Sequence, residues 1–541
     1  MDRLLTSKGM KAVDEYTINQ IGIPSMVLME RAALSVSEVI KNIVNKEQKI
    51  LCICGTGNNG ADTSAVARQL VCEGYKAYVV VVGDESKGSE EFATQIKIAR
   101  QCGVIFFEPV TNAYDDAYNH ICTFIKNECV VIVDGIFGIG LSREIQGTIK
   151  LLLEDIEKIT KERSSAENKL NIVAVDVPSG LNATTGEIMG CVMKADYTVT
   201  FGSAKAGMYL YQGKDVCGRI TVCDIGFPPG AYESDIIKEN QSYNEIKNED
   251  ISRYLVRKAH TNKGSYGKVL IVAGSKGMYG AAYLAAMASF RAGVGLVRIV
   301  THKENRELIY KMLPEAMIDT YESVEDIDKL GLEKSVEWAD SVLVGPGISQ
   351  EDTARELVRI VMEKSKILNK YLVIDADGLN IIAKDDSLRE NYYENVIITP
   401  HIGEASRLME LEISQIARDI VSAALDYADK YNINVVLKDS TSVILGIESF
   451  GDKCNNRAYV NTSGNAGMAV AGSGDVLAGM IAGVVAGGLD RELVNEDLTK
   501  ALAIAVYIHG MAGDMAAREK GQTSMTATDI LDEIAKVLCT L

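Results

Sequence analysis

A glycine-rich turn near the C-terminal end of the chain carries the clearest chemical signal. The run Gly472-Ser473-Gly474-Asp475 places a carboxylate directly before an apolar, helix-like segment. Backbone amides at the start of a helix are unpaired and lie at the positive end of the helix dipole, so phosphate binds there favourably. Bound phosphate would repel an Asp in such a turn, so an Asp there is expected to have a function. The plausible function is to accept a proton from an attacking hydroxyl group. The turn therefore predicts phosphoryl transfer with Asp475 as the base, and an ordinary helix-capping Asp is the alternative.

A second glycine turn follows a strand-like run in the first half of the chain. Its sequence, Gly55-Thr56-Gly57-Asn58-Asn59-Gly60-Ala61-Asp62, contains GxGxxG, and a helix is expected to begin at Asp62. A dinucleotide fingerprint needs its helix N-terminus free to meet a pyrophosphate, whereas here Asp62 stands at the mouth of the turn. The two asparagines suit a monovalent cation and a polar ligand better than a bare pyrophosphate cradle. A structural turn capped by Asp62 is the alternative.

Three further strand ends in the same half deliver charged side chains. Asp134 opens a glycine-rich loop, Asp176 opens Asp-Val-Pro-Ser-Gly, and Lys205 follows a strand that ends at Phe201. Ligands of open α/β sheets collect at the carboxyl ends of strands. A buried acid near an ammonium group is a means of tuning a proton-transferring pair. Each Asp alone is more often a cap, but four such loops in one half favour a shared site.

The second half offers three more polar strand ends. His401, in Thr-Pro-His, is expected to donate a hydrogen bond to an anionic substrate, with a packed surface histidine as the alternative. Asp377, in Asp-Gly-Leu-Asn, could position magnesium through water, and a plain turn Asp is an equal alternative. The run Lys438-Asp439-Ser440-Thr441-Ser442 offers a cation, hydroxyl groups and amides to a nucleotide phosphate.

The elements that must hold these residues are parallel strands alternating with helices. Apolar β-branched runs alternate with helix-period segments throughout the chain, which predicts an α/β fold with two domains. The polar, acidic segment 231–250 lacks an apolar period and predicts a linker, so the expected domains are 1–230 and 251–541. The expected strands are Ile50–Cys54, Tyr78–Val82, Val130–Asp134, Ile172–Asp176, Tyr197–Phe201, Lys268–Ala273, Leu296–Thr301, Ser341–Val344, Tyr371–Asp375, Asn395–Thr399 and Asn434–Lys438.

Composition excludes several classes of partner. A formal net charge of −18 argues against nucleic acid or an anionic membrane as the main partner, because either would favour a basic face. Eleven cysteines, an odd number without CxxC pairs, are typical of a reducing cytosol. The N-terminal residues lack an apolar signal region, and the most apolar segment, Val476 to Leu489, is short and rich in glycine. We therefore expect a cytoplasmic protein without a membrane span.

Both halves resemble one family. The loops Asn-Asn-Gly-Ala-Asp-Thr, Asp-Val-Pro-Ser-Gly and Phe-Gly…Lys resemble the epimerase module of the NAD(P)HX repair enzymes. The second half resembles the ribokinase-like dehydratase domain of the same family, and the resemblance covers essentially the whole chain in that order. The motifs that carry this second resemblance are Lys263-Gly264-Ser265-Tyr266-Gly267, Gly277-Met278-Tyr279-Gly280-Ala281, Gly345-Pro346-Gly347, Asp375-Ala376-Asp377-Gly378-Leu379-Asn380, Thr399-Pro400-His401 and the Gly-Ser-Gly-Asp turn. The chain departs from the family pattern at Ala61, Thr63, Asn262 and Ile402.

The resemblance implies a set of site residues. It implies an N-terminal Rossmann-like three-layer α/β/α sandwich and a C-terminal ribokinase-like α/β/α domain. Asp176 and Lys205 become candidates for moving the proton at C6 of the substrate, and Asn59, Asp134 and Ser179 for holding a potassium ion. The implied substrate site of the epimerase comprises Asn58, Asn59, Gly60, Ala61, Asp62, Gly138, Ile139, Gly140, Leu141, Ser142, Arg143, Glu144 and Asp176. That of the dehydratase comprises Ala281, Gly347, His401 and Asp475, with Lys438, Asp439, Ser440, Thr441, Ser442, Gly472, Ser473 and Gly474 around the nucleotide.

The resemblance also implies an activity. NAD(P)HX is the reduced nicotinamide cofactor with water added across C5=C6, so that C6 carries a hydroxyl group. The first domain would interconvert the R and S epimers of NADHX and NADPHX, and the second would dehydrate the S epimer with ADP as phosphoryl donor and magnesium. We also expect a homo-oligomer.

Other classes of function stay open at this point. A ribokinase-superfamily small-molecule kinase fused to an NAD-binding domain shares the Gly-Ser-Gly-Asp turn but leaves the first half unexplained. An oxidoreductase that binds NAD through Gly55–Gly60 is the second alternative. A first half that only binds, with catalysis confined to the second half, is the third.

Overall fold

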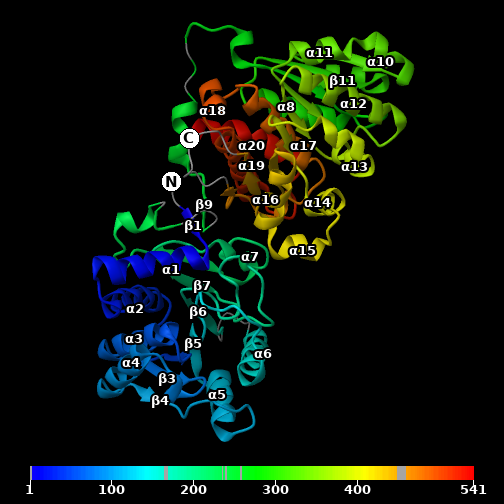
Figure 1. Cartoon of the computed structure of the whole chain (residues 1–541). Coiled ribbons are helices and arrows are strands. Elements are labelled where there is room, and N and C mark those ends of the chain that lie inside the picture. The colour runs from blue at the N-terminus through cyan, green and yellow to red at the C-terminus, as the bar shows by residue number, and fades with distance from the viewer. Residues whose placement is uncertain are drawn as a thin grey trace. The chain divides into compact units, whose positions relative to one another are not determined.

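The expected strands all form, and they divide between two compact α/β units. The computed structural model describes residues 3–163, 169–233, 235–237, 241–255, 257, 259–447 and 458–541 (Figure 1). The chain divides between Ser242 and Tyr243, giving an N-terminal unit from residue 3 to 242 and a C-terminal unit from 243 to 541. Among the described residues, no helix combines the length and the apolar character needed to cross a membrane.

The N-terminal unit is built on a sheet whose neighbouring strands all run parallel, in the order β4-β3-β2-β5-β6-β7-β8. Because the chain moves outward from β2 to β4 and then returns to β5, the order reverses between β2 and β5. A crevice opens at such a reversal, at the carboxyl ends of the strands. The strands of this unit are β1 Arg3–Leu5, β2 Lys49–Cys54, β3 Lys76–Val81, β4 Ile105–Phe106, β5 Cys129–Gly135, β6 Asn171–Val175, β7 Tyr197–Phe201 and β8 Arg219–Cys223.

Helices cover both faces of this sheet, because its strands are apolar on both sides. Ile50, Cys52 and Cys54 of β2 pack into the cluster under α1 to α4, whereas Leu51 and Ile53 pack into the cluster under α5 and α6. The unit is therefore a three-layer α/β/α sandwich. Its helices are α1 Ser7–Glu15, α2 Ser25–Lys41, α3 Asn58–Cys72, α4 Glu90–Gln101, α5 Asp116–Asn127, α6 Gly147–Glu162 and α7 Gly213–Val216.

The C-terminal unit has strand order β9-β18-β17-β16-β15-β14-β13-β10-β11-β12. The strands from β12 to β16 pair in parallel, and the reversal of order falls between β10 and β13. Strands β17 and β18 add antiparallel pairs at one side. The strands are β9 Ser242–Asn244, β10 Lys268–Val272, β11 Leu296–His302, β12 Met317–Tyr321, β13 Ser341–Val344, β14 Tyr371–Ile374, β15 Val396–Ile398, β16 Asn434–Leu437, β17 Val443–Leu445 and β18 Ala458–Val460.

A large apolar cluster joins one face of this sheet to α8, α17, α19 and α20. Glycine makes the closest of these contacts possible, since a Cβ atom on Gly479 of α17 would lie 2.1 Å from the Ala285 carbonyl oxygen of α8. The helices of the unit are α8 Tyr279–Arg291, α9 Arg306–Met312, α10 Val324–Leu330, α11 Leu332–Trp338, α12 Asp352–Ile367, α13 Asp377–Lys384, α14 Ile402–Met409, α15 Ile413–Arg418, α16 Ile420–Tyr431, α17 Ser473–Val485, α18 Arg491–Glu496, α19 Leu498–Lys520 and α20 Ala527–Thr540.

The segment 231–250, expected to be a linker, contributes structure where it is described. It contains β9, and Tyr243 and Ile246 are 6% and 4% exposed. Residues 234 and 238–240 of this segment lie outside the described residues. Its few apolar side chains are too widely spaced to give a helix or strand period, which is why the sequence pattern did not reveal them.

The helix after the first glycine turn begins four residues earlier than expected. Helix α3 starts at Asn58 rather than Asp62, so the two asparagines form its first turn. The early start depends on Gly60, where a Cβ atom would lie 1.8 Å from the carbonyl oxygen of Gly55. The close approach draws the first turn of the helix onto the end of β2.

We predict that Gly60→Ala destabilises the N-terminal unit by about 1–3 kcal/mol or more, because the added methyl group overpacks this contact. Urea unfolding followed by far-UV circular dichroism should show an early transition, while the fluorescence of Trp338, the single tryptophan of the chain, reports on the C-terminal unit. Gly57→Ala is the matched control, since no atom lies within 4 Å of its added Cβ atom. Equal unfolding midpoints for the two variants would contradict this account of the turn.

Candidate active sites

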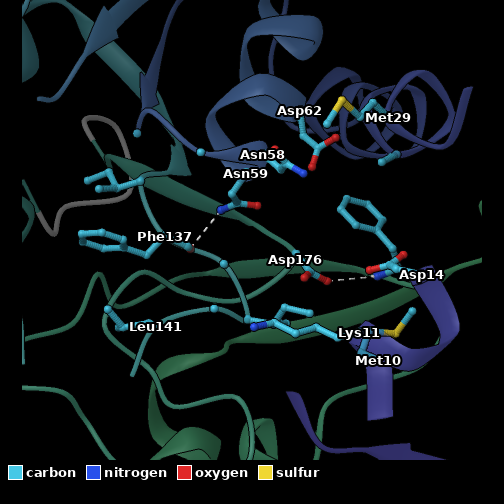
Figure 2. A pocket seen from close by; sticks show the side chains of 18 of the residues that line it. Met10, Lys11, Asp14, Met29, Asn58, Asn59, Asp62, Phe137, Leu141 and Asp176 are labelled. Atoms are coloured by element: carbon cyan, nitrogen blue, oxygen red, sulfur yellow. Dashed lines mark hydrogen bonds between the residues drawn. The ribbon is translucent and has the colours of Figure 1, made fainter. Parts of the chain in front are cut away.

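The N-terminal unit contains a cavity of about 910 Å³ at the carboxyl ends of its strands. The cavity opens where the strand order reverses, between the turn after β2 and the loop after β5. Helices α1 and α2 form its other walls. Figure 2 shows acidic and amide side chains from both sides directed into it.

A buried ion pair lies in this cavity. The Lys205 ammonium donates to Asp176 Oδ1 at 2.5 Å, to Thr200 Oγ1 at 2.7 Å and to the Phe201 carbonyl at 3.0 Å. The Lys205 side chain is 1% exposed and that of Asp176 is 14% exposed. Leu5 of β1 pairs in parallel with Lys205, which fixes the backbone behind the ammonium group. The ammonium group of Lys205 compensates the charge of Asp176, which borders the open cavity.

Asp176 adopts an unusual backbone conformation. Its φ angle is 64°, in the left-handed region that non-glycine residues rarely occupy. Such a conformation costs about 1–3 kcal/mol and persists only where the surroundings impose it. Here the Asp176 amide is held by the Val199 carbonyl at 2.8 Å and the carboxylate by Lys205. The strained turn directs the carboxylate into the cavity instead of along the strand.

Two further acids line the cavity, and one of them was missed by the sequence analysis. Asp62 was expected there, whereas Asp14 comes from α1, outside any strand-end loop. Burial and the charge of Asp176 raise the pKa of Asp14 to about 6. The same two causes raise the pKa of Asp62 well above its ordinary value. No sequence signal could have found Asp14, because it is an ordinary acid in an amphipathic helix.

The predicted cation residues lie together at the ends of β5 and β6. The Asp134 carboxylate accepts from the Ser179 amide at 2.7 Å, from the Ser179 hydroxyl at 2.6 Å and from the Ile136 amide at 3.3 Å. The Asn59 amide donates to the Phe137 carbonyl at 2.9 Å. Asp134 is fully buried, and burial raises its pKa to about 6 despite these hydrogen bonds. None of the described groups that bond to this carboxylate carries a positive charge.

The other predicted residues of this site divide into those that line the cavity and those that do not. Gly60 and Ala61 are buried behind the first turn of α3, and Glu144 lies outside the lining. Thr63 is also buried, with its hydroxyl donating to the Asn59 carbonyl at 2.8 Å. The departures from the family pattern at Ala61 and Thr63 therefore point into the protein. The lining residues are Asn58, Asn59, Asp62, Gly138, Ile139, Gly140, Leu141, Ser142, Arg143 and Asp176.

In the C-terminal unit, Asp475 lies in the first turn of α17. The helix begins at Ser473, and Gly472 before it has a φ angle of 90°, which only glycine adopts readily. Burial, followed by the charge of Asp375, raises the pKa of Asp475 to about 7. A carboxyl group with this pKa can accept a proton near neutral pH.

A second buried ion pair lies beside Asp475. The Lys438 ammonium donates to Asp375 Oδ1 at 2.7 Å, and the Thr399 hydroxyl donates to the same oxygen at 2.7 Å. A Cβ atom on Gly474 would lie 3.5 Å from Lys438 Nζ and 3.9 Å from Asp375 Oδ2. The predicted nucleotide-binding lysine and the Gly-Ser-Gly-Asp turn thus meet at one point. Burial lowers the pKa of Lys438, but the negative charges of Asp375 and Glu404 outweigh the effect of burial, so the pKa of Lys438 is raised.

Asp375 and Glu404 are the residues of this site for which the sequence analysis proposed no role. Each follows a strand end, but the analysis assigned the chemistry to the neighbouring Asp377 and His401. Asp375 is 1% exposed and Glu404 is 5% exposed. Burial raises the pKa of Glu404, the ammonium of Lys438 opposes this shift, and Asp375 adds to it.

His401 caps α14 through one ring nitrogen. Its Nδ1 accepts from the amides of Gly403 at 3.0 Å and Glu404 at 3.4 Å, which leaves Nε2 to carry the proton of the neutral ring. Nε2 lies 3.5 Å from Glu404 Oε1, and the side chain is 56% exposed. The ring is therefore oriented as a hydrogen-bond donor at the surface of the site.

The remaining predicted residues differ in what they contact. Gly347 lies against Ala281, since an added Cβ atom would approach the Ala281 side chain to 3.0 Å. The Asp377 carboxylate accepts from the Ser349 amide at 3.0 Å and from Gln350 at 3.3 Å. Thr441 is buried, whereas Asp439 and Ser440 are exposed. In the parts of the chain that the structure describes, no three His, Cys, Asp or Glu side chains form a ready metal site.

Both halves of the chain match known protein families. The family model described as NAD(P)H-hydrate dehydratase matches residues 269–536, and that described as YjeF-related protein N-terminus matches residues 25–207. The bifunctional NAD(P)H-hydrate repair enzyme of Thermofilum pendens is 33% identical over 98% of this chain and 94% of its own. That of Moorella thermoacetica is 32% identical over 99% of this chain and 96% of its own.

A solved structure matches the second half. The ADP/ATP-dependent NAD(P)H-hydrate dehydratase from Bacillus subtilis, co-crystallised with ATP and Mg²⁺, is 27% identical. It covers 53% of this chain and 95% of its own, with a TM-score of 0.43. Because the relatives match nearly the full length of both partners, the chain belongs to the family of bifunctional NAD(P)H-hydrate repair enzymes.

Proposed function

We propose that this protein repairs hydrated nicotinamide cofactors. The N-terminal unit epimerises R- and S-NAD(P)HX, and the C-terminal unit dehydrates the S epimer to NAD(P)H with ADP, which becomes AMP and phosphate. The observation that carries the proposal is the Asp475 carboxylate, set at the N-terminus of α17 beside the Lys438 ammonium. Membership of the family over the full chain supports the pairing of the two activities.

The dehydration step solves the problem that hydroxide is a poor leaving group. Asp475 accepts the proton of the C6 hydroxyl, and the terminal phosphoryl group of the nucleotide is transferred to the oxygen. The amides of Gly472, Ser473 and Gly474 stabilise the charge that builds on the phosphoryl oxygens. The phosphate then leaves with the C6–O electron pair as N1 donates its own pair, and loss of a proton from C5 restores the C5=C6 double bond.

We assign the nucleotide phosphates to Lys438 and the loop to Ser442, and the substrate to Ala281, Gly347 and His401. Lys438 is an ammonium group held in place by Asp375, which suits a phosphate ligand. Bound magnesium would neutralise part of the negative charge of the phosphates. Asp377 would position magnesium through a bound water molecule. Its carboxylate oxygens already accept hydrogen bonds from Ser349 and Gln350, so direct coordination of the ion is less favourable.

The first prediction concerns the base. Purified protein with chemically hydrated NADH, ADP and magnesium should regain the absorbance of the reduced cofactor and release inorganic phosphate. Since Asp475 must be ionised to accept a proton, kcat/KM for the S epimer should be constant above pH 7. It should fall tenfold per pH unit below its pKa of about 7.

Asp475→Asn should lower this rate by about 10²–10⁴-fold and remove the acid limb of the profile. Running ADP and ATP in parallel tests which donor is used. A stable phosphorylated product in place of inorganic phosphate would instead identify a small-molecule kinase. Full activity of the Asn variant would refute the role of Asp475.

The epimerase proposal assigns the cavity of the N-terminal unit to the substrate. Asp176 and Lys205 move the proton that inversion at C6 requires. They are the buried ion pair that borders the cavity. The loops 58–62 and 138–144 place the amides and side chains that would hold the ligand.

The second prediction separates the two activities. With a mixture of both epimers, ADP and magnesium, the unaltered protein should convert all of the substrate. Asp176→Asn should stop after the S fraction is consumed, because the R epimer is no longer converted. The initial rate on pure S epimer is the internal control, and it should match that of the unaltered protein. Equal loss for both epimers would contradict two separable sites.

We also propose that Asn59, Asp134 and Ser179 hold a potassium ion in the N-terminal unit. The donor set fits, because a fully buried carboxylate, which has no cationic partner among the described residues, lies beside side-chain and main-chain oxygens. When bound, the ion supplies a positive charge that fixes the loop after β5. The side chains themselves orient that loop at Phe137. The Asn59 amide group donates to the Phe137 carbonyl, and the Phe137 backbone amide donates to the Ser179 hydroxyl at 2.8 Å.

The third prediction tests this cation by stability, independently of activity. The melting temperature of the protein should be higher in potassium chloride than in choline chloride at equal ionic strength, because the ion binds only the folded site. Asp134→Asn should abolish the difference between the two salts, whatever its own melting temperature. An unchanged difference in the variant would exclude Asp134 as a ligand.

We propose a cytoplasmic location and self-association as well. The ten cysteines of the described chain are all free, which suits a reducing compartment. The side chains of Leu308 and Met312, one turn apart on α9, are 43% and 45% exposed, and such exposed apolar side chains suit contact with another copy.

A further inference from the structure

The cavity of the N-terminal unit contains more acid than its single buried ammonium can neutralise. Asp14, Asp62 and Asp176 all line it, and the ammonium of Lys205 is bonded to Asp176. Lys11 and Arg143 also line the cavity, but both side chains are exposed to solvent. Like charges in a space of low dielectric cannot all ionise, so at least one of the remaining acids holds its proton.

Asp14 is placed for chemistry by a helix whose first turn is fixed in two ways. The Thr6 hydroxyl caps α1 by accepting from the Gly9 amide at 3.1 Å. Gly9 lies against the chain, since an added Cβ atom would be 2.2 Å from the Gln241 carbonyl oxygen. Met10, Lys11 and Asp14 of this helix all line the cavity, and Met10 is 3% exposed.

No structural role accounts for the Asp14 carboxyl group. Within the described residues it has neither a hydrogen bond nor an ion pair, and its interactions with neighbours are those of charge alone. Figure 2 shows it directed toward the same part of the cavity as Asp176, from the opposite side. A carboxyl group that is half-buried, unpaired and turned into a substrate-sized cavity is placed to meet a ligand.

We infer that Asp14 is the second acid–base residue of the epimerase, acting as proton donor while the Lys205-paired Asp176 acts as proton acceptor. This inference rests on the proposed function. It adds a catalytic residue that comes from α1 and lies outside the strand-end loops.

The step balances as follows. Asp14 gives its proton to the C6 hydroxyl, the C6–O bond breaks, and its electron pair leaves with the oxygen as water. The lone pair of N1 forms an N1=C6 double bond. A water molecule then attacks C6 from the opposite face, and Asp176 accepts one of its protons. The two carboxyl groups exchange roles for the reverse direction, and a proton passes back between them to restore the starting state.

The surrounding charges agree with this division of roles. Burial and Asp176 raise the pKa of Asp14 to about 6, Lys205 opposes that shift, and Glu15 on the same helix adds to it. The other groups near Asp14 are Asp62 and the hydroxyl of Tyr232. Since the protonated form is the donor, epimerisation should be fastest below pH 6 on this limb and decline as the pH rises above it.

The test uses the full-length protein without nucleotide, so that the C-terminal unit cannot consume the S epimer. Pure S epimer is supplied, and appearance of the R epimer is followed by chromatography, with the rate without protein subtracted. Asp14→Asn should lower kcat by about 10²-fold or more, with KM changed by less than about twofold, and should remove the decline above pH 6. Asp14→Glu should recover part of the rate.

Glu15→Gln is the matched control, because it removes an exposed acid from the neighbouring position of the same helix. It should retain the rate of the unaltered protein below pH 6 and move the decline only slightly to lower pH, because Glu15 is the smallest of the causes that act on the pKa of Asp14. Asp62→Asn tests the alternative that Asp62 is the proton donor. If this variant loses the decline above pH 6 while Asp14→Asn keeps it, the donor is Asp62 and the inference is wrong.

A measurement on the unaltered protein tests the same step without a variant. In H₂¹⁸O, each inversion should place one ¹⁸O atom on C6, because the original oxygen leaves as water. Inversion with retention of ¹⁶O would overturn the step. A protein that does not epimerise at all would refute the proposed function itself. A protein that epimerises equally well as Asp14→Asn would refute only the inference.

Discussion

One interaction recurs in both units and governs the chemistry of each: an ammonium group bonded to a carboxylate at the end of a buried strand. Lys205 lies 2.5 Å from Asp176 in the N-terminal unit, and Lys438 lies 2.7 Å from Asp375 in the C-terminal unit. Parallel strands covered by helices on both faces leave their charged ends in a poorly solvated space. Each carboxylate there needs a cation or a proton.

In each site, one carboxyl group that we assign to proton transfer is not the one bonded to the buried ammonium. That group is Asp14 in the first unit and Asp475 in the second, and burial together with the neighbouring carboxylate raises the pKa of each, to about 6 and about 7. These values lie close to neutral pH, where a group can both give and accept protons. The same arrangement thus serves two different reactions, and the difference lies in what surrounds it. A helix N-terminus suited to phosphate accompanies Asp475, whereas an amide-lined cavity accompanies Asp14 and Asp176.

The sequence predicted the fold, and it singled out several of the charged residues that the structure places in the two candidate sites, for identifiable reasons. All eleven expected strands form, because strands buried on both faces are apolar throughout and end in charged or glycine-rich loops. Short strands such as β17 and β18 were not predicted, since three residues give no readable period. The start of α3 was placed four residues late, because the asparagines of its first turn are typical of loops. Five charged residues of the two sites lie at the ends of strands or helices, where the local sequence reveals them: Asp134, Asp176, Lys205, Lys438 and Asp475.

What the sequence determined by itself is therefore local: which segments become strands, which turns need glycine, and which charged groups follow them. Only the tertiary structure decided which of these groups share a space and which of them keep their protons. Asp14 enters the first site because α1 packs against the chain near Gln241, more than 200 residues away in the sequence. Asp375 enters the second as the partner of Lys438. Protonation depends on burial and on the distance to other charges, and both are properties of the packed molecule that no short stretch of residues contains.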